Sequence, residues 1–449
     1  MDYQEALEYL DTFVDYEKST TYKYTDFKLE RMQKILERMG NPQNNFKSIH
    51  IAGTKGKGST CAFMFSILKN AGYKVGLYTS PHLLNFRERI KISYVNDLGE
   101  TRERLINEEE VCKVIEEIKP LTDEIKELTL FEVYTVMAFK FFSDMGMMFA
   151  ILETGLGGRL DATNVVKPII CGITNISYDH VQVLGGDLTR IAQEKAGIIK
   201  EDAIVVSAPQ SPEAFKVITE VCKQQKGRLY EVGSDFACDT IGQDLSGSFF
   251  DFRGIFDNYE NLHISLIGQF QLINATLAIA IIQLLRLYDI VISLIAIKNG
   301  LDSAYWPGRM QLVHKKPNVI FDGAQNAASA HALKIAINQL ITPGKSVLIL
   351  GVSKDKDVEG ICEHLCRQQS LIILTQGQSK RAMDVDTLAS RIPRFQKVIR
   401  KTVHVEQALK LAVENAGPED LILLTGSLYL VGEAFKVLKT INFSPSAKG

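Results

Sequence analysis

The first half of the chain alternates short apolar runs with helical patterns. The apolar runs are Ile49–Ala52, Val75–Tyr78, Phe149–Leu152, Ile169–Ile173 and Ala203–Val206. Runs of four or five apolar residues bounded by polar residues and glycine are typical of buried strands, and the segments between them repeat apolar residues with the period of a helix. The alternation predicts an α/β fold in which helices cover a parallel-rich, doubly wound sheet.

A second alternating series begins near residue 305. Before it, residues 233–266 carry short aromatic alternations that predict a small antiparallel meander, and helices are expected at Gln271–Leu287 and Val291–Leu301. Pro307 and Gly308 then interrupt the helical pattern. Five further strands are expected at Val319–Phe321, Ser346–Leu350, Leu371–Leu374, Lys397–Ile399 and Leu421–Leu424. We therefore predict two domains, residues 1–304 and a smaller Rossmann-like domain of residues 305–449.

The loop after the first predicted strand is rich in glycine, lysine and hydroxyl residues. It reads Gly53-Thr54-Lys55-Gly56-Lys57-Gly58-Ser59-Thr60. The glycines let backbone N–H groups surround a polyphosphate, the next helix adds the positive end of its dipole, and Lys57 supplies a charge. The spacing differs from the common G-x-x-x-x-G-K-[ST] loop, which disfavours a kinase or motor protein. We predict a site for nucleotide phosphates; the alternative is a glycine-rich turn with Lys57 in solvent.

Composition and charge disfavour nucleic acid and membranes as partners. A chain of 449 residues exceeds the usual size of a single core. It carries 51 basic and 53 acidic residues, and this near-neutral balance gives no electrostatic footprint for nucleic acid or an anionic membrane. The two most apolar stretches, Val133–Leu152 and Leu272–Ile297, both contain charged residues, so we predict no membrane span.

The cysteines and the N-terminus bear on the compartment. Seven cysteines, an odd number scattered through the chain, disfavour a disulfide framework and favour a reducing environment. Cys362 and Cys366 would share a helix face, but two thiols do not complete a zinc site, so we expect buried helix residues. The first residues lack the apolar core of a signal peptide. We expect a cytoplasmic protein and, in the absence of coiled-coil heptads, a monomer.

Further motifs follow the loop in a fixed order. They are Tyr78-Thr79-Ser80-Pro81-His82-Leu83, Thr129-Leu130-Phe131-Glu132, Leu152-Glu153-Thr154-Gly155-Leu156-Gly157-Gly158-Arg159-Leu160-Asp161-Ala162-Thr163-Asn164, Asp179-His180, Glu194-Lys195-Ala196-Gly197, Trp306-Pro307-Gly308-Arg309, Phe321-Asp322-Gly323-Ala324 and Gly426-Ser427-Leu428-Tyr429. With these motifs the chain resembles the folylpolyglutamate synthase and dihydrofolate synthase family of the Mur ligase superfamily. The resemblance implies an ATP-binding domain of the central Mur ligase type over residues 1–304 and a Mur ligase C-terminal-type domain over residues 305–449.

The resemblance also implies a reaction. It is the ATP- and Mg²⁺-dependent addition of L-glutamate to folate or dihydropteroate through an acyl phosphate, with ADP and phosphate as products. The partners would then be small molecules. Two alternatives stay open: a Mur-type amino-acid ligase with another acceptor, and a P-loop NTPase that drives a conformational switch. The sequence also leaves open the choice between dihydropteroate and tetrahydrofolate and the length of any polyglutamate tail.

Several residues are expected to act in catalysis. Ser80, Glu153 and His180 each follow a predicted strand, where open α/β sheets place ligands, and the resemblance implies that they hold Mg²⁺. Their structural alternatives are a turn residue, an ion pair and a core histidine. Lys195 lies among apolar residues, where burial favours a neutral amine that can react with CO₂, and its family counterpart is carbamylated. The expected catalytic residues are Lys57, Glu153, His180, Lys195 and Arg309.

The resemblance assigns the remaining site residues to nucleotide and acceptor. Asn274 is expected on the adenine side, Arg309 at the phosphates and Asp322 at the nucleoside, together with the loop residues Gly53, Thr54, Gly56, Lys57, Gly58, Ser59 and Thr60. Phe131 could stack on the acceptor's ring or pack in the core. The expected acceptor contacts are Thr129, Phe131, Glu132, Leu160, Asp161 and Ala162.

Two positions depart from the family pattern. Lys55 stands where asparagine is common, and it adds a positive charge near the phosphates. Gln325 stands where the Asp-Gly-Ala-His-Asn run has histidine, and it can donate a hydrogen bond but cannot titrate. Neither change removes an expected metal ligand.

Overall fold

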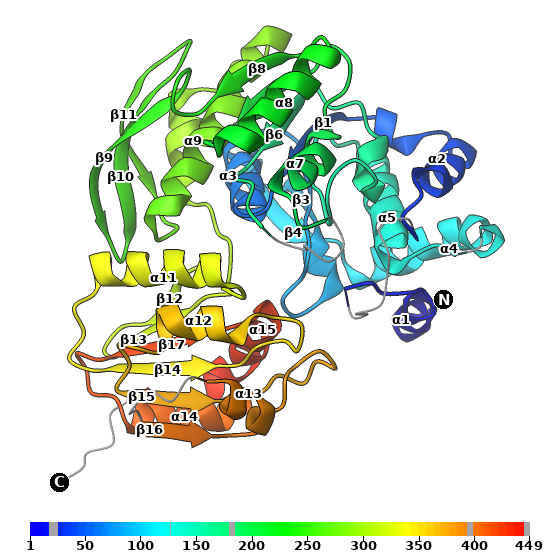
Figure 1. The fold of residues 1–449 in the computed structure, drawn as a ribbon. Helices are drawn as coiled ribbons and strands as arrows, with labels where there is room; N and C mark the ends of the chain where they lie inside the picture. The colour runs from blue at the N-terminus through cyan, green and yellow to red at the C-terminus, as the bar shows by residue number, and fades with distance from the viewer. Residues whose placement is uncertain (18–25, 126, 179–184, 393–397, 444–449) are drawn as a thin grey trace. The chain divides into compact units, whose positions relative to one another are not determined.

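The chain divides into two compact units (Figure 1). The computed structural model describes residues 1–17, 26–125, 127–178, 185–392 and 398–443. The first unit contains residues 1–241, 249–265 and 271–305, and the second contains residues 242–248, 266–270 and 306–449. Each unit is built around its own sheet.

An eight-stranded sheet organises the first unit, in the order β4-β3-β2-β5-β1-β6-β7-β8. β3 is antiparallel to β2 and β4, and the other neighbours are parallel. The strands are β1 (Lys47–Ala52), β2 (Val75–Tyr78), β3 (Ile90–Val95), β4 (Thr101–Leu105), β5 (Phe149–Glu153), β6 (Ile170–Ile173), β7 (Ile204–Ser207) and β8 (Arg228–Glu231). The five predicted strands are confirmed, and β3, β4 and β8 extend the sheet beyond the prediction.

Helices cover both faces of this sheet, as the unbroken apolar strands require. They are α1 (Tyr3–Asp11), α2 (Leu29–Arg38), α3 (Lys57–Asn70), α4 (Glu108–Glu124), α5 (Leu130–Asp144), α7 (Leu188–Ala196), α8 (Pro212–Gln224), α9 (Gln269–Leu284) and α10 (Leu294–Asp302). Ala52 packs in the cluster under α7 and α8, while Ile51 meets Ile281 of α9 beside Gly172. Successive residues of β1 therefore face opposite helical layers.

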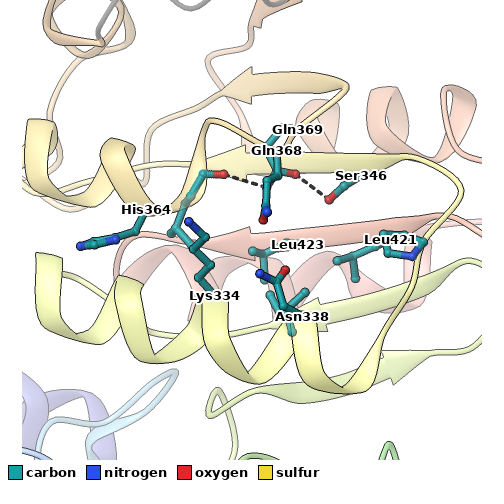
Figure 2. A pocket seen from close by; sticks show the side chains of 11 residues that line it. Lys334, Asn338, Ser346, His364, Gln368, Gln369, Leu421 and Leu423 are labelled. Carbon is teal, nitrogen blue, oxygen red and sulfur yellow. Dashed lines mark hydrogen bonds between the residues drawn. The ribbon is translucent and has the colours of Figure 1, made fainter.

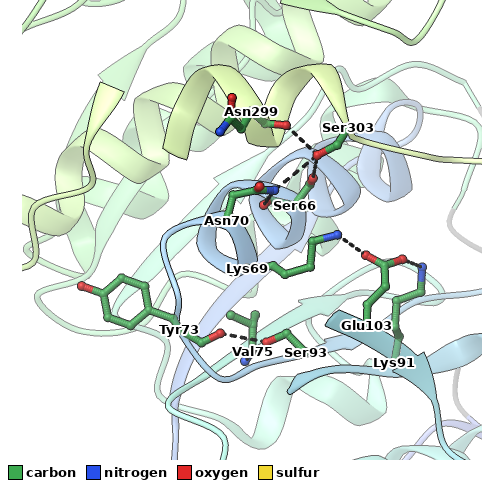
Figure 3. Close-up of polar contacts among 10 residues, drawn as sticks. All are labelled: Ser66, Lys69, Asn70, Tyr73, Val75, Lys91, Ser93, Glu103, Asn299 and Ser303. Atoms are coloured by element: carbon green, nitrogen blue, oxygen red, sulfur yellow. Dashed lines mark hydrogen bonds and ion pairs between the residues drawn. The ribbon is translucent and has the colours of Figure 1, made fainter. Parts of the chain in front are cut away.

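Polar contacts hold the far end of α3, the helix that follows the glycine-rich loop (Figure 3). Lys69 Nζ lies 2.6 Å from Glu103 Oε2 on β4, and Lys91 of β3 contacts the other oxygen of that carboxylate at 3.1 Å. Ser66 Oγ is 3.2 Å from Ser303 Oγ, just after α10. The helix is thus fixed to the sheet edge and to α10, which sets the position of its N-terminus.

The part of the chain between β8 and α9 forms the expected meander. Its strands are β9 (Ala237–Asp244), β10 (Gly247–Arg253) and β11 (Tyr259–Ile264), in the order β11-β10-β9. The following helix α9 continues in the short helix η5 (Leu285–Tyr288). Residues 269–288 are long and apolar enough to cross a membrane, but 78% of the most apolar window is buried inside the protein, as in the core helix of a globular fold.

A six-stranded sheet organises the second unit, in the order β12-β13-β17-β14-β15-β16. Only the edge strand β12 pairs antiparallel among these strands. The strands are β12 (Gln311–His314), β13 (Asn318–Phe321), β14 (Ser346–Leu350), β15 (Leu371–Leu374), β16 (Val398–Lys401) and β17 (Leu421–Thr425). The helices are α11 (Ala327–Leu340), α12 (Val358–Leu365), α13 (Val385–Arg391), α14 (Val405–Glu414) and α15 (Leu428–Val437). This confirms the predicted second α/β series, and Cys362 and Cys366 are buried as expected.

Candidate active site

Four strands of the first sheet end at one edge. β1 lies between β5 and β6, and β2 lies on the other side of β5, all in parallel. β5 ends at Glu153, and β1, β6 and β2 lead into Gly53, Thr174 and Ser80. Open α/β sheets bind ligands at this edge, where the order of strands reverses. The topology thus gathers the loop and two of the expected metal ligands.

The glycine-rich loop tolerates no side chain at two of its positions. α3 is capped by Gly56 with φ of 93°, and a Cβ there would lie 2.1 Å from Asn274 Oδ1. A Cβ at Gly53 would lie 1.8 Å from Thr174 Oγ1. Asn274 is buried and donates to Gln271 Oε1 at 2.9 Å. The structure therefore places the Asn274 carboxamide against the glycine-rich loop, and its adenine contact stays a prediction.

Two lysines meet at one carbonyl of the loop. Lys57 Nζ donates to Gly53 O at 3.2 Å, and Lys195 Nζ donates to the same oxygen at 2.7 Å. Lys195 is 5% exposed. Lys57 Nζ also lies 3.9 Å from Glu153 Oε1. Two lysine side chains and a carboxylate thus converge at the N-terminus of α3, where Lys57 and the backbone N–H groups of the helix suit phosphate charges.

Glu153 is the central acid of this group. It is 4% exposed, and its Oε2 accepts from the Ser80 N–H at 3.2 Å. This hydrogen bond connects the segment after β2, which contains Ser80, to the end of β5. His180 lies outside the described residues, and within the described part of the chain no three His, Cys, Asp or Glu side chains cluster closely enough to hold a metal ion. The hard oxygens of Glu153 and Ser80 suit a magnesium ion.

Two of the expected acceptor contacts cap a helix. Thr129 is the N-cap of α5, where its Oγ1 accepts from Glu132 N at 3.2 Å while Glu132 Oε2 accepts from Thr129 N at 2.7 Å. Arg31 of α2 donates its Nε to Glu132 Oε1 at 3.0 Å. Burial raises the pKa of Glu132. Sequence reasoning missed Arg31, because it lies 101 residues away and no local pattern links it to the site.

Phe131 lies beside the turn that follows β5. Its Cζ atom would be 2.6 Å from a Cβ on Gly155, so only glycine leaves room for the ring. The ring centroid is 5.9 Å from that of Tyr78. Leu160 is half-buried and Ala162 is buried nearby in sequence. The half-buried Phe131 ring is available to a flat apolar ligand at this edge.

Asp161 faces inward rather than toward solvent. It is 4% exposed, and its Oδ2 accepts from the N–H groups of Gly155 and Leu156, each at 2.9 Å. Its Oδ1 accepts from the N–H of Thr163 at 3.0 Å and also from the Thr163 hydroxyl. These contacts give the carboxylate a structural task in holding the turn, which the expectation of an acceptor contact did not foresee.

The expected residues of the second unit lie close to one another. Asp322 follows β13, and its carboxylate accepts from Ala324 N at 2.7 Å and from Met310 N at 2.8 Å. Arg309 Nη1 would lie 2.7 Å from a Cβ on Gly323. Asp322 therefore fixes the backbone that carries Arg309. Their contacts with nucleotide stay predictions.

A cavity of about 270 Å³ in the second unit lies away from these residues (Figure 2). Ser346 and Leu421 in its wall begin β14 and β17, so the cavity lies at the amino ends of those strands. Its polar rim carries Lys334, Asn338 and His364. Asp322 and Arg309 are near the opposite edge, and the cavity contains none of the expected site residues.

Two domain families match the chain. Residues 51–282 match the Mur ligase middle domain, and residues 308–428 match the Mur ligase glutamate ligase domain. The first match ends inside α9, and the second begins at Gly308.

Relatives of the whole chain are similar along nearly its full length. The dihydrofolate synthase/folylpolyglutamate synthase of Bacillus subtilis is 33% identical over 422 residues, covering 92% of this chain and 95% of that protein. The Mycobacterium tuberculosis folylpolyglutamate synthase complexed with ADP and AMPPCP has a TM-score of 0.86 at 30% identity, covering 97% and 99% of the two chains. A Yersinia pestis folylpolyglutamate synthase/dihydrofolate synthase with AMPPNP and a manganese ion has a TM-score of 0.83 at 29% identity, covering 98% of each chain.

Proposed function

The chain belongs to the folylpolyglutamate synthase and dihydrofolate synthase family of the Mur ligase superfamily, ATP-dependent ligases that add glutamate to folate, and from this membership we propose how its own residues act. The acceptor's carboxylate attacks the γ-phosphorus of ATP, and the bond to the β-phosphate breaks to release ADP. The glutamate amine then attacks the acyl phosphate. The tetrahedral intermediate loses phosphate, the amine proton is released, and an amide remains.

One observation carries this proposal: the convergence of Lys57, Lys195 and Glu153 at the loop carbonyl of Gly53. Bringing an anionic carboxylate to a triphosphate requires positive charge that is already in place, because reorganising solvent would cost part of the gain. Lys57 and the N–H groups at the start of α3 supply it at the β- and γ-phosphates. The arrangement positions the reacting groups and compensates their charge.

The resident oxygens fit a divalent cation. Glu153 and the Ser80 hydroxyl would hold it, with His180 as the third expected ligand, and Lys57 beside Glu153 limits the excess of negative charge. When bound, the cation neutralises charge on the phosphates and on the attacking carboxylate.

We assign the carbamate to Lys195. The amine is buried and lies 2.7 Å from Gly53 O, next to the loop. Carbamylation would first remove one proton from the ammonium and then join the neutral nitrogen to the carbon of CO₂ with loss of a second proton, which turns a cation into an anion near Glu153. The Arg159–Glu194 ion pair, at 2.9 Å, holds the C-terminal end of α7 in place beside the turn at residues 155–161.

Residence in the cytoplasm and a monomeric state complete the proposal. All seven cysteines are free thiols, and five of them are buried, which suits a reducing compartment. Size-exclusion chromatography with light scattering at several concentrations tests the monomer, and a concentration-dependent mass would overturn it.

The reaction is tested with purified protein, Mg²⁺ and ATP. ADP release is measured with dihydropteroate plus glutamate, with tetrahydrofolate plus glutamate, and with each component alone, and the acceptor's mass is recorded. A gain of one glutamate on either acceptor supports the proposal and identifies the acceptor. Release of ADP without acceptor and without any mass gain would instead support a switch NTPase.

A further inference from the structure

A buried line of hydrogen bonds joins the centre of the sheet to the turn after β5. It starts at His50 of β1, passes through the Thr163 hydroxyl and reaches Asp161. His50 Nε2 is 2.8 Å from Thr163 Oγ1, and the Thr163 hydroxyl contacts Asp161 Oδ1. His50 and Thr163 are 0% exposed and Asp161 is 4% exposed. We propose that His50 is a positioning residue for the acceptor side of the active site, acting through Thr163 and Asp161 on the turn at Gly155. The proposal rests on the proposed function.

The direction of the line follows from what each group can donate. Asp161 accepts from the backbone N–H groups of Gly155, Leu156 and Thr163, which can only donate. An ionised carboxylate satisfies all of them, so the Thr163 hydroxyl also donates to it. That hydroxyl oxygen must then accept from His50, which fixes the imidazole as the neutral tautomer with its proton on Nε2. His50 Nδ1 correspondingly has no hydrogen-bond partner among the described residues.

At its far end, the line of hydrogen bonds fixes the turn at Gly155 and Leu156, which lies beside the Phe131 ring. Asp161 Oδ2 holds the N–H groups of Gly155 and Leu156, and this turn follows Glu153 directly. The Phe131 ring occupies the space over Gly155. The ring packs directly against Gly155, which has no side chain. A movement of the turn would therefore change the position of the ring. His50 therefore acts on the platform for the acceptor through its side chain, which contacts Thr163, while its backbone belongs to the strand that leads into Gly53.

A buried histidine is suited to holding the Thr163 hydroxyl in one orientation. Burial of an imidazole costs free energy, and the Nε2 contact with Thr163 offsets this cost only in part. Burial also lowers the pKa of His50 to about 3, with Lys200 contributing in the same direction. The imidazole is therefore neutral across the working range of pH. A rigid neutral donor at the sheet centre fixes the hydroxyl proton of Thr163 in one direction.

Conservative pairs of variants test the proposal. Thr163→Val removes the hydroxyl with little change of shape, and Thr163→Ser retains it. His50→Leu removes the donor, and His50→Gln can place an amide N–H near the position of Nε2. Ser93→Ala is the control, since Ser93 also bridges backbone groups inside this unit, accepting from Val75 N and donating to Tyr73 O (Figure 3). These groups lie at the amino end of β2, whereas the site lies at the carboxyl ends of the strands.

Steady-state kinetics with ATP and the accepted pteroyl substrate give the main readout. We expect Thr163→Val and His50→Leu to raise KM for the acceptor at least tenfold and to leave KM for ATP within twofold. Thr163→Ser and His50→Gln should return the acceptor KM to within threefold of the parent protein. Equal changes in both KM values, no change in either, or the same acceptor effect in Ser93→Ala would overturn the proposal.

A second readout does not depend on activity. Nitrogen chemical shifts of ¹⁵N-histidine-labelled protein identify the tautomer, and His50→Gln assigns the signal by its loss. We expect a neutral ring protonated on Nε2 down to pH 5. A ring protonated on Nδ1, or a charged ring at pH 6, would contradict the proposed line. If the parent protein used neither pteroyl acceptor, the proposed function would fail while this spectrum still decided the hydrogen-bond line.

Discussion

The ammonium groups of Lys57 and Lys195 both donate to the carbonyl oxygen of Gly53, from helices that are separated by more than a hundred residues of sequence. A carbonyl has two lone pairs and can accept both. Lys57 brings a positive charge to this oxygen beside Glu153, while the charge contributed by Lys195 depends on whether its amine is carbamylated. The predictions below separate the contributions of these groups.

Replacing Lys57 by methionine should abolish most of the ligase rate. The change removes a preplaced charge at the phosphates, and the loss of one such donor costs on the order of 10²–10³-fold in kcat. Lys69→Met on the same helix is the matched control, because Lys69 pairs with Glu103 away from the loop (Figure 3). Initial rates at saturating ATP measure the effect, and comparable rates for the two variants would refute the assignment.

Glu153→Gln should weaken metal binding selectively. The amide keeps the size of the side chain but loses the negative charge and one acceptor oxygen. Titration of the protein with Mn²⁺ in the presence of a non-hydrolysable ATP analogue, followed by electron paramagnetic resonance, should show a Kd at least about tenfold higher. Glu103→Gln serves as the control acid. An unchanged Kd would mean that Glu153 is only the partner of Lys57.

Lys195 should exchange with CO₂ if it is carbamylated. Protein prepared with ¹³C-bicarbonate should show a carbamate carbon signal that disappears in Lys195→Ala. Because the missing group is an anion, acetate or another short carboxylate should restore part of the activity of Lys195→Ala. A parent spectrum without the signal, together with no rescue, would leave Lys195 as a cation bonded to Gly53.

Gly56→Ala should impair ATP binding, and the cause can be identified with Asn274. A Cβ at Gly56 would lie 2.1 Å from Asn274 Oδ1, and the φ of 93° is itself unfavourable for alanine. Asn274→Ala removes the clashing oxygen, so the double variant should bind ATP better than the sum of the single effects predicts, by about 0.5–3 kcal/mol. Calorimetric Kd values for ATP complete the cycle. If the effects of the two single variants on ATP affinity were strictly additive, the loss in Gly56→Ala would come from the backbone conformation alone.

Acid should destabilise the protein partly through His50. Its pKa is lowered to about 3 in the fold, so between pH 6.5 and 3 the unfolded chain binds one more proton at this site than the native protein. That contribution to stability is complete above pH 6.5 and is lost as the pH falls, at about 1.4 kcal/mol per pH unit. Urea unfolding from pH 7 to 4 should show this slope in the parent and not in His50→Leu. The pKa of Asp161 is raised by burial, which acts in the opposite direction in both proteins.

Local sequence patterns were sufficient for most of the fold. Apolar runs of four or five residues closely bounded by turns are typical of buried strands, and β2, β14 and β15 begin and end where the pattern predicts. β4 was missed because it carries charged residues at an exposed sheet edge, where packing does not demand apolar side chains. β3 lies inside that edge with Ile90 and Ile92 buried, and its short alternation with Lys91 and Ser93 was overlooked. The meander and α9 were predicted from alternation and from helical periodicity.

The sequence by itself determined the glycine-rich turn from β1 into α3, because a strand-like run, spaced glycines and a helical pattern follow one another there. Only the tertiary structure decided which groups lie around that turn. Lys195 reaches Gly53 O across 142 residues of sequence, and Asn274 fills the space left by Gly56. The tertiary structure also buries Asp161 and connects it through Thr163 to His50, which the sequence alone shows only as one residue of a buried strand. Burial and hydrogen-bond direction at these positions arise from parallel strand pairing between distant segments, which no local pattern encodes.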